Sequence, residues 1–254
     1  GPLQVYPNND LRPETAINIE AGLKQGVQLG GVQGFLDVAA FFQEYDDFVE
    51  FTFGQWGAPT EALAGNGFRS LNTGRSRVSG WEVSWMGRAK WGGSTIDMLA
   101  GYTYTNPVSL TPDYLYSVVT NANGDTVGGA SYNNTSRDTT GSVLKYRSQN
   151  LVRLDAEWRK GNWFVGLSAR YQSALRNIDQ AWLTFEELGV VDWGLQTWLD
   201  NNPTLPWIYD FRAGCNVAEN HKLSLVVSNL TNAEYSIRPL AIEPPRLTQI
   251  MYTY

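Results

Sequence analysis

PPRLTQIMYTY, residues Pro244–Tyr254, ends the chain on an aromatic residue. Thr248, Ile250, Tyr252 and Tyr254 share one parity, and the residues between them share the other. That period of two predicts a β-strand. Chain ends usually fray in polar sequence, so a chain that stops inside an aromatic strand is unusual for a soluble domain. Such an ending is expected of a barrel, which must close its last strand on an earlier one.

The composition excludes helical membrane proteins but not membrane barrels. The chain has 254 residues, of which 43% are hydrophobic, and no apolar run approaches the ~20 residues that a spanning helix needs. A barrel strand needs only ~9–11 residues, and its apolar residues alternate with polar ones, so it contains no continuous apolar run. The chain also carries 10 Trp and 13 Tyr, which suits aromatic girdles at two membrane interfaces.

Charge and cysteine content exclude several function classes. The net charge is −6 without a basic block, so we expect no nucleic-acid partner. A single Cys215 and a single His221 exclude a disulfide framework and a Cys- or His-based metal site. We find no Ser/His/Asp arrangement and therefore predict no catalytic residue, no metal, no cofactor and no enzyme activity. The first residues, Gly1–Leu3, do not resemble a signal peptide, so an exported protein would lack its natural N-terminus here.

Nine segments alternate apolar and polar residues and are predicted as strands. The second, at about 34–53, is longer than a usual globular strand, and a barrel strand that projects beyond the membrane explains its length. Asp46 and Asp47 fall in its outer end, with a calcium site as the alternative interpretation. The strands lie at about 16–25, 34–53, 76–90, 95–105, 150–160, 163–173, 207–217, 222–230 and 244–254.

Short and long connections alternate strictly along these strands. The short turns lie near 28–32, 91–93, 160–162 and 218–221, and the long connections at about 55–74, 106–148, 174–205 and 231–243. In an up-and-down antiparallel sheet this alternation places all long connections at one end. Outer-membrane barrels have that asymmetry, with long loops on the extracellular side, whereas such loops are uncommon in a compact soluble domain.

Charged residues lie mid-strand on one parity, opposite an aliphatic parity with Trp or Tyr toward the strand ends. Buried charges are costly unless they are paired, and a wide, wet lumen removes that cost. The alternative is a soluble sandwich with the apolar face inward, which the loop alternation, the terminal aromatic and the Trp content oppose. The predicted lumen-facing charges are Arg153, Asp155, Glu157, Arg170, Asp210 and Arg212.

Several segments resemble one family, the TonB-dependent outer-membrane receptors. Residues 8–15 and 20–24 are similar to its NPDLKPE…E.GLK segment, and 75–82 to a strand that ends in G.E. Residues 229–235 resemble NLFDKEY, and 244–246 match its C-terminal PPR. Asn9 replaces the usual proline and Thr231 the usual aromatic. The run 238–246 resembles Bacteroidetes members in particular.

The resemblance implies an all-β, transmembrane, antiparallel up-and-down barrel of about 22 strands with an N-terminal plug. Residues 1–254 would form its C-terminal part, the last nine strands, without plug, TonB box or N-terminal strands. The implied partners are the rest of the same receptor, TonB through the plug, and outer-membrane lipid of a Gram-negative bacterium. A surface lipoprotein partner is left open. Ile250, Tyr252 and Tyr254 would be the signal that the insertion machinery reads.

The long connection at 174–205 is the best candidate for ligand contact, because exposed aromatics recruit ligands or partners. The alternative is that they pack the loop against its neighbours. The lumen charges would brace the plug through ion pairs, with substrate contact as their alternative. The ligand-loop candidates are Trp182, Phe185, Trp193 and Trp198, with Tyr114 and Tyr116 in the 106–148 connection.

Three functions compete at this point. The leading one is active import of a scarce ligand with TonB-supplied energy, with this chain as barrel wall and extracellular vestibule. The second is a passive porin-like or structural barrel. An outer-membrane enzyme would need an exposed Ser/His arrangement that the sequence lacks. The substrate stays open, because siderophore, vitamin, glycan and peptide receptors share this wall.

Overall fold

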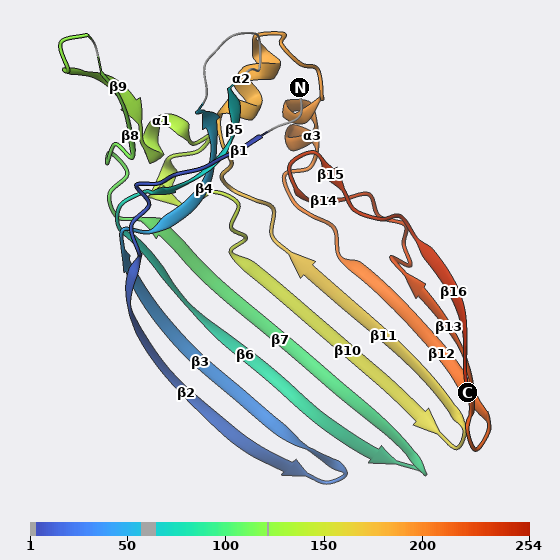
Figure 1. Ribbon diagram of the computed structural model, residues 1–254. Helices are drawn as coiled ribbons and strands as arrows, with labels where there is room; N and C mark the ends of the chain where they lie inside the picture. Colours follow the sequence, from blue (N-terminus) through green and yellow to red (C-terminus); the bar gives the residue numbers. More distant parts are fainter. Residues whose placement is uncertain (1–3, 57–64, 121) are drawn as a thin grey trace.

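A computed structural model describes residues 4–56, 65–120 and 122–254, and its largest element is a sheet of nine antiparallel strands, the main sheet. Each strand pairs with the main-sheet strands that precede and follow it in the chain (Figure 1), so the predicted up-and-down sheet is confirmed. The strands are β2 (Thr15–Leu29), β3 (Val32–Asp46), β6 (Ser76–Trp91), β7 (Ser94–Ser109), β10 (Asn150–Lys160), β11 (Trp163–Gln172), β12 (Ile208–Ala218), β13 (His221–Ser228) and β16 (Leu247–Thr253).

The strand register gathers the apolar residues on one face of the main sheet. One cross-strand row runs Leu23, Val38, Val83, Tyr102 and Val152. Because side chains alternate along each strand, the residues between these lie on the opposite face, which carries the charges. We name these surfaces the apolar face and the polar face. Much of the apolar face is exposed, as expected of a surface that meets lipid.

Turns of two residues join the strands at one end of the main sheet, and the long connections all lie at the other end (Figure 1). Gly30 and Gly161 each begin such a turn with a φ near +55°, a conformation that glycine adopts without a steric penalty. No described helix has both the length and the apolar content needed to cross a membrane.

The second predicted strand, 34–53, is wrong as a single element. β3 ends at Asp46, and Asp47 takes a φ of 53°, which turns the chain out of the main sheet. β4 (Val49–Gln55) then pairs with β5 (Asn66–Asn72), and β1 (Gln4–Tyr6) adds to β5 in parallel. The first long connection therefore starts near 47 rather than 55, and its residues 57–64 lie outside the described part.

The long connections fold together into what we name the loop assembly, the described parts of 47–75, 110–149, 173–207 and 229–246. Its buried core consists of Phe53, Ile178, Trp182, Leu183 and Leu195. Two short helices lie in the connection 174–205. Its further elements are β8 (Ser117–Thr120), β9 (Thr126–Ala130), α1 (Tyr132–Thr135), a 3-10 turn (Thr140–Ser142), α2 (Ala181–Glu187), α3 (Leu195–Asn201), β14 (Ser236–Arg238) and β15 (Ala241–Ile242).

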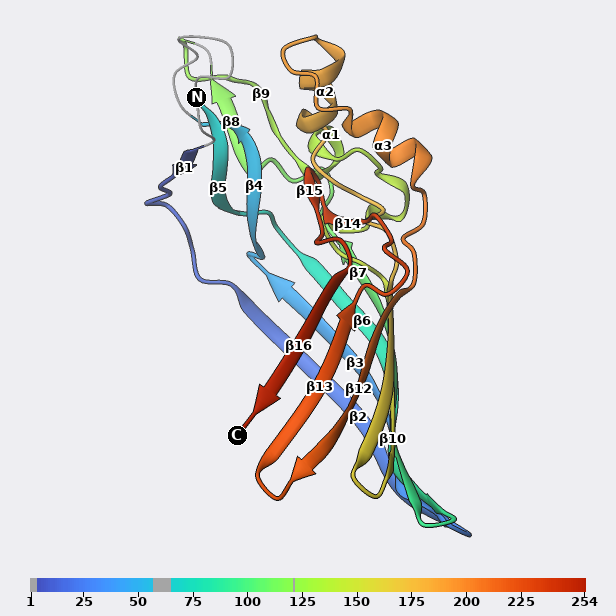
Figure 2. The same cartoon turned by 90° about the vertical axis from the view of Figure 1, so that its right-hand side faces the viewer.

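The main sheet is curved and open, and its outermost strands β2 and β16 each pair on one side only (Figures 1 and 2). An open edge leaves backbone N–H and C=O groups without partners, which hydrocarbon does not tolerate. The sheet as described is therefore a wall segment rather than a closed barrel.

Candidate functional site

Asp179 joins three long connections at the centre of the loop assembly. Its side chain is 1% exposed and pairs with Lys145, whose Nζ lies 2.6 Å from Oδ1. The Tyr146 hydroxyl donates to Oδ2 at 2.7 Å, and the Phe53 amide donates to the same oxygen at 3.4 Å. Since a buried charge must be paired and hydrogen-bonded, these contacts hold 47–75, 110–149 and 173–207 in one arrangement.

An aromatic stack extends this junction. The ring of Trp182 stacks on Phe53 at 4.4 Å between centroids, and Phe68 meets Phe53 edge-on at 5.2 Å. Nε1 of Trp182 donates to the Tyr146 hydroxyl at 2.8 Å. Burial raises the pKa of Tyr146 above its usual value, with the Asp179 carboxylate as a second cause, so this hydroxyl stays protonated. Trp182 and Phe185 therefore pack within the loop assembly, and ligand contact by either residue stays a prediction.

A cavity of about 1070 Å³, the sheet-side cavity, lies where the loop assembly meets the polar face. Thr103, Thr105, Leu151 and Gln172 line it from the main sheet. The β4 residues 49–52 and the loop residues 145–149 line it from above, together with Trp182. Its size suits a ligand, since ligand cavities measure roughly 300–1,000 Å³.

The charges around the sheet-side cavity are unevenly paired. Lys145 and Asp179 neutralise each other, whereas the guanidinium groups of Arg147 and Arg238 make no hydrogen bond or ion pair within the described residues. Burial raises the pKa of the Glu50 carboxyl, and Asp179 adds to the rise; the cations Lys145 and Arg147 oppose it. The lining therefore carries more positive than negative charge.

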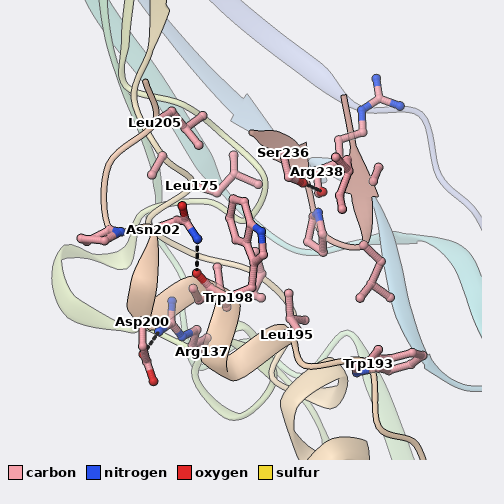
Figure 3. Close-up of a pocket in the computed structure, with 18 of the residues that line it drawn as sticks. Arg137, Leu175, Trp193, Leu195, Trp198, Asp200, Asn202, Leu205, Ser236 and Arg238 are labelled. Atoms are coloured by element: carbon pink, nitrogen blue, oxygen red, sulfur yellow. Dashed lines mark hydrogen bonds and ion pairs between the residues drawn. The ribbon is translucent and has the colours of Figure 1, made fainter. Parts of the chain in front are cut away.

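A second cavity of about 740 Å³, the helix-side cavity, lies between α3 and the β14–β15 hairpin (Figure 3). Trp193, Leu195 and Trp198 give it apolar walls. At its rim Arg137 lies 3.9 Å from Asp200. The residues that line both cavities are Leu175, Arg238, Pro239 and Leu240, so the hairpin borders the two.

Tyr114 and Tyr116, the weaker ligand candidates, are absent from the described linings of both cavities. Tyr114 is exposed and lies beside Arg12. The Tyr116 hydroxyl shares a 2.7 Å hydrogen bond with Thr135, and burial raises its pKa. Among the aromatic residues predicted to contact a ligand, Trp193 and Trp198 line the helix-side cavity and Trp182 lines the sheet-side cavity.

Most of the predicted lumen charges neutralise one another on the polar face. Arg212 donates to both oxygens of Asp155 at 2.8 and 2.9 Å, and to Glu157 at 2.7 Å. Arg170 pairs with Asp210 at 2.8 Å. These ion pairs offset the free-energy cost of placing charges on the polar face, and they link the neighbouring strands β10, β11 and β12.

Arg153 is the exception among these charges. It is exposed, and its side chain makes no hydrogen bond or ion pair within the described residues. It lies opposite Arg170 and Gly101 in the register, so no acid on the neighbouring strands faces it directly. Bracing of a plug by the lumen charges stays a prediction, and Arg153 is the side chain with a free charge for it.

Ile250 and Tyr252 share one parity of the terminal strand and lie on the same face of the main sheet. Ile250 pairs with Leu225 and Tyr252 with Leu223 on the apolar face. His221, expected in an exposed turn, instead begins β13 and hydrogen-bonds the Tyr252 hydroxyl. The Tyr254 ring lies 5.0 Å from the imidazole. A role of this aromatic cluster in membrane insertion stays a prediction.

Several residues that build the site were not predicted. Lys145 and Asp179 each stand next to apolar residues inside a long polar connection, a pattern that could have indicated a buried charge. Their pairing could not be read from the sequence, because 34 residues separate them. Arg147 and Arg238 carry no local signal that distinguishes them from solvated arginines.

Comparison with known proteins gives a consistent result. The family model described as "TonB dependent receptor-like, beta-barrel" matches residues 1–230. The search of curated proteins found no match. Among solved structures, the copper transporter OprC superposes with a TM-score of 0.56 at 13% identity over 97% of this chain and 32% of its own.

Two siderophore-related structures are similar to the same degree. The ferric-catecholate import receptor Fiu from E. coli K12 has a TM-score of 0.55 at 19% identity, over 96% of this chain and 28% of its own. The siderophore receptor PirA from Pseudomonas aeruginosa has a TM-score of 0.55 at 13% identity, over 99% and 31%. The chain thus spans about a third of the length of these structures, and at such identities the likeness concerns the fold.

Proposed function

The chain belongs to the TonB dependent receptor-like β-barrel family and lies in the outer membrane of a Gram-negative bacterium, and from this premise we propose that it forms wall and vestibule of an active importer. In this proposal residues 1–254 are the C-terminal part of the barrel, and the long connections are extracellular. The ligand binds at the loop assembly, and energy delivered through TonB moves a plug so that the ligand passes along the polar face.

The sheet-side cavity is the observation that carries this proposal. It opens on the polar face directly below loops that Asp179 and its partners hold in place. A pre-organised cavity at the mouth of a wide lumen supports capture before passage, since fixed loops lose little entropy on binding. A simple pore would need no such cavity between its loops and its wall.

The proposed partners follow from the open parts of the wall. The unpaired edges of β2 and β16 would join further strands of the same receptor. Arg153 would face a carboxylate of the plug, through which TonB acts. A surface lipoprotein that covers the loop assembly is a further proposal, for which the exposed Tyr114 and Leu115 offer contact area.

Energy dependence tests the proposal. Cells that carry the full-length receptor are given a mixture of ferric siderophores, cobalamin, oligosaccharides and peptides, and the compounds that enter are identified by mass spectrometry. We expect at least one compound to accumulate in cells with active TonB and to stay outside in an isogenic tonB deletion. Equal entry of the same compounds in both strains would instead establish the passive channel.

A further inference from the structure

Two arginines line the sheet-side cavity without an ion-pair partner among the described residues. Arg147 comes from the end of the second long connection and Arg238 from β14 in the last one. Both are exposed, and neither guanidinium group makes a hydrogen bond or ion pair with a described residue. Elsewhere in the loop assembly Arg137 and Arg176 have acidic partners at 3.9 and 3.1 Å. The two free cations thus meet at one cavity.

The acids of the same cavity compensate these cations only in part. The described lining contains two acids, Glu50 and Asp179, against three cations, and Asp179 pairs with Lys145 at 2.6 Å. Burial raises the pKa of the Glu50 carboxyl, and the cations Lys145 and Arg147 oppose the rise. The whole chain has a net charge of −6, so the positive lining is a local feature of this cavity rather than a general property of the surface. Fields of one sign inside a cleft concentrate ligands of the opposite sign.

An apolar platform lies beside the charges. Phe51 is 52% exposed, although its ring stacks on Phe68 at 4.9 Å with an interplanar angle of 9°. Both rings line the sheet-side cavity. Stacked rings with an exposed side offer a flat apolar surface on which a planar or aliphatic group can lie.

From this arrangement we propose that the sheet-side cavity binds an organic anion, with its anionic group at Arg147 and Arg238 and its apolar body on Phe51 and Phe68. Guanidinium groups match carboxylate or phosphate oxygens in paired hydrogen bonds. The proposal names the ligand class of the cavity and rests on the proposed receptor function. It assigns these four residues to ligand recognition.

A matched pair of probes tests the charge requirement directly. 2-Naphthoate and 2-naphthamide have the same ring body and differ in charge, and their dissociation constants are measured on the full-length receptor in nanodiscs by calorimetry. We expect naphthoate to bind at least about tenfold more tightly, because a charge-assisted hydrogen bond contributes roughly that factor. We also expect its affinity to fall with added salt.

Variants locate the effect within the cavity. Arg147→Gln and Arg238→Gln should each weaken naphthoate binding about tenfold and leave naphthamide unchanged, whereas Phe51→Ala should weaken both probes equally. Arg137→Gln is the matched control, because this arginine lines only the helix-side cavity. Since neither guanidinium group makes a hydrogen bond or ion pair with a described residue, we expect the fold to survive, and circular dichroism checks it.

Three results would overturn the proposal: equal affinity of the intact receptor for the two probes, unchanged naphthoate binding in a variant that combines Arg147→Gln with Arg238→Gln, or no naphthoate binding at millimolar concentration. Its failure is separable from failure of the import function. A receptor that prefers the neutral probe but accumulates its ligand only with active TonB loses the anion proposal alone. A receptor that prefers the anion without TonB dependence loses only the import proposal.

Discussion

Asp179 is the residue on which the loop assembly depends most. Its carboxylate accepts hydrogen bonds from Lys145, Tyr146 and the Phe53 amide, and almost none of it is exposed. All three partners lie in long connections other than the one that contains Asp179. A single buried carboxylate thus fixes the relative placement of segments far apart in the chain.

Lys145→Met should destabilise the loop assembly by about 3–5 kcal/mol, because it leaves the Asp179 charge buried without its cation. Faster amide hydrogen exchange in α2 of the full-length receptor measures the loss. A double variant that adds Asp179→Asn should recover most of it, since the amide still accepts hydrogen bonds without a charge. Arg137→Gln, which breaks an exposed pair, should cost at most about 1 kcal/mol. Unchanged exchange in the lysine variant would contradict this role.

Glu50 gives the loop assembly a pH dependence with a definite sign. Burial raises the pKa of its folded form above 4.5, the ordinary value for Glu, so folding favours the neutral acid. The stabilisation is present below the unfolded pKa and is lost as the pH rises through the folded pKa. Glu50→Gln should therefore protect β4 amides at pH 7 and make little difference below pH 4.5.

The matched control for this pH effect is Glu82→Gln, at an exposed position on the polar face. It should leave β4 exchange unchanged at both pH values. Slower exchange in wild type than in the Glu50 variant at pH 7 would show that the ionised carboxylate stabilises the loop assembly, contrary to this account.

Among the elements, β6 gives the sharpest test of which face meets lipid. Val83 lies in the central apolar row and Ser84 on the polar face, where it pairs in register with Asp37. Val83→Arg should cost about 2–4 kcal/mol in a bilayer, the usual cost of a charge at mid-membrane on the lipid side. Ser84→Arg should be tolerated, because water can solvate the guanidinium group and the Asp37 carboxylate can pair with it. The folded fraction in outer-membrane preparations measures both, and equal tolerance would contradict the assigned faces.

The strands of the main sheet were predictable because each carries its own signal. Alternation within a strand and strict alternation of connection lengths gave all nine strands and their faces. The end of β3 was missed although the alternation is interrupted there, because two polar residues, Asp46 and Asp47, are followed by two apolar ones, Phe48 and Val49. This interruption was a local signal for the turn, and Asp tolerates a positive φ better than most residues.

The site was less predictable than the sheet, for a physical reason. The aromatic-rich connection 174–205 was predicted as the best candidate for ligand contact, which stays a prediction, and two of its tryptophans line the helix-side cavity. The sheet-side cavity, however, is assembled from described residues of four long connections and three strands of the main sheet. Contacts such as Lys145 with Asp179 arise from tertiary packing, which a single sequence does not encode as a local pattern.

At the scale of the whole molecule, the loop assembly and the main sheet are stabilised in different ways. Most buried apolar side chains belong to the loop assembly, whereas the main sheet exposes its apolar face. Water would penalise that face, and lipid would not. The open edges of β2 and β16 impose a second requirement, since their unpaired backbone groups must be satisfied before the sheet can lie in hydrocarbon.

Amide hydrogen exchange of β16 in the full-length receptor tests most directly whether the main sheet is the wall of a closed barrel. Every second N–H of Leu247–Thr253 points away from β13. If another strand closes the barrel there, we predict that all amides of β16 are protected as strongly as those of the central strand β10. If every second amide of β16 exchanges as fast as the Gly92–Gly93 turn, the edge is open and the account is contradicted.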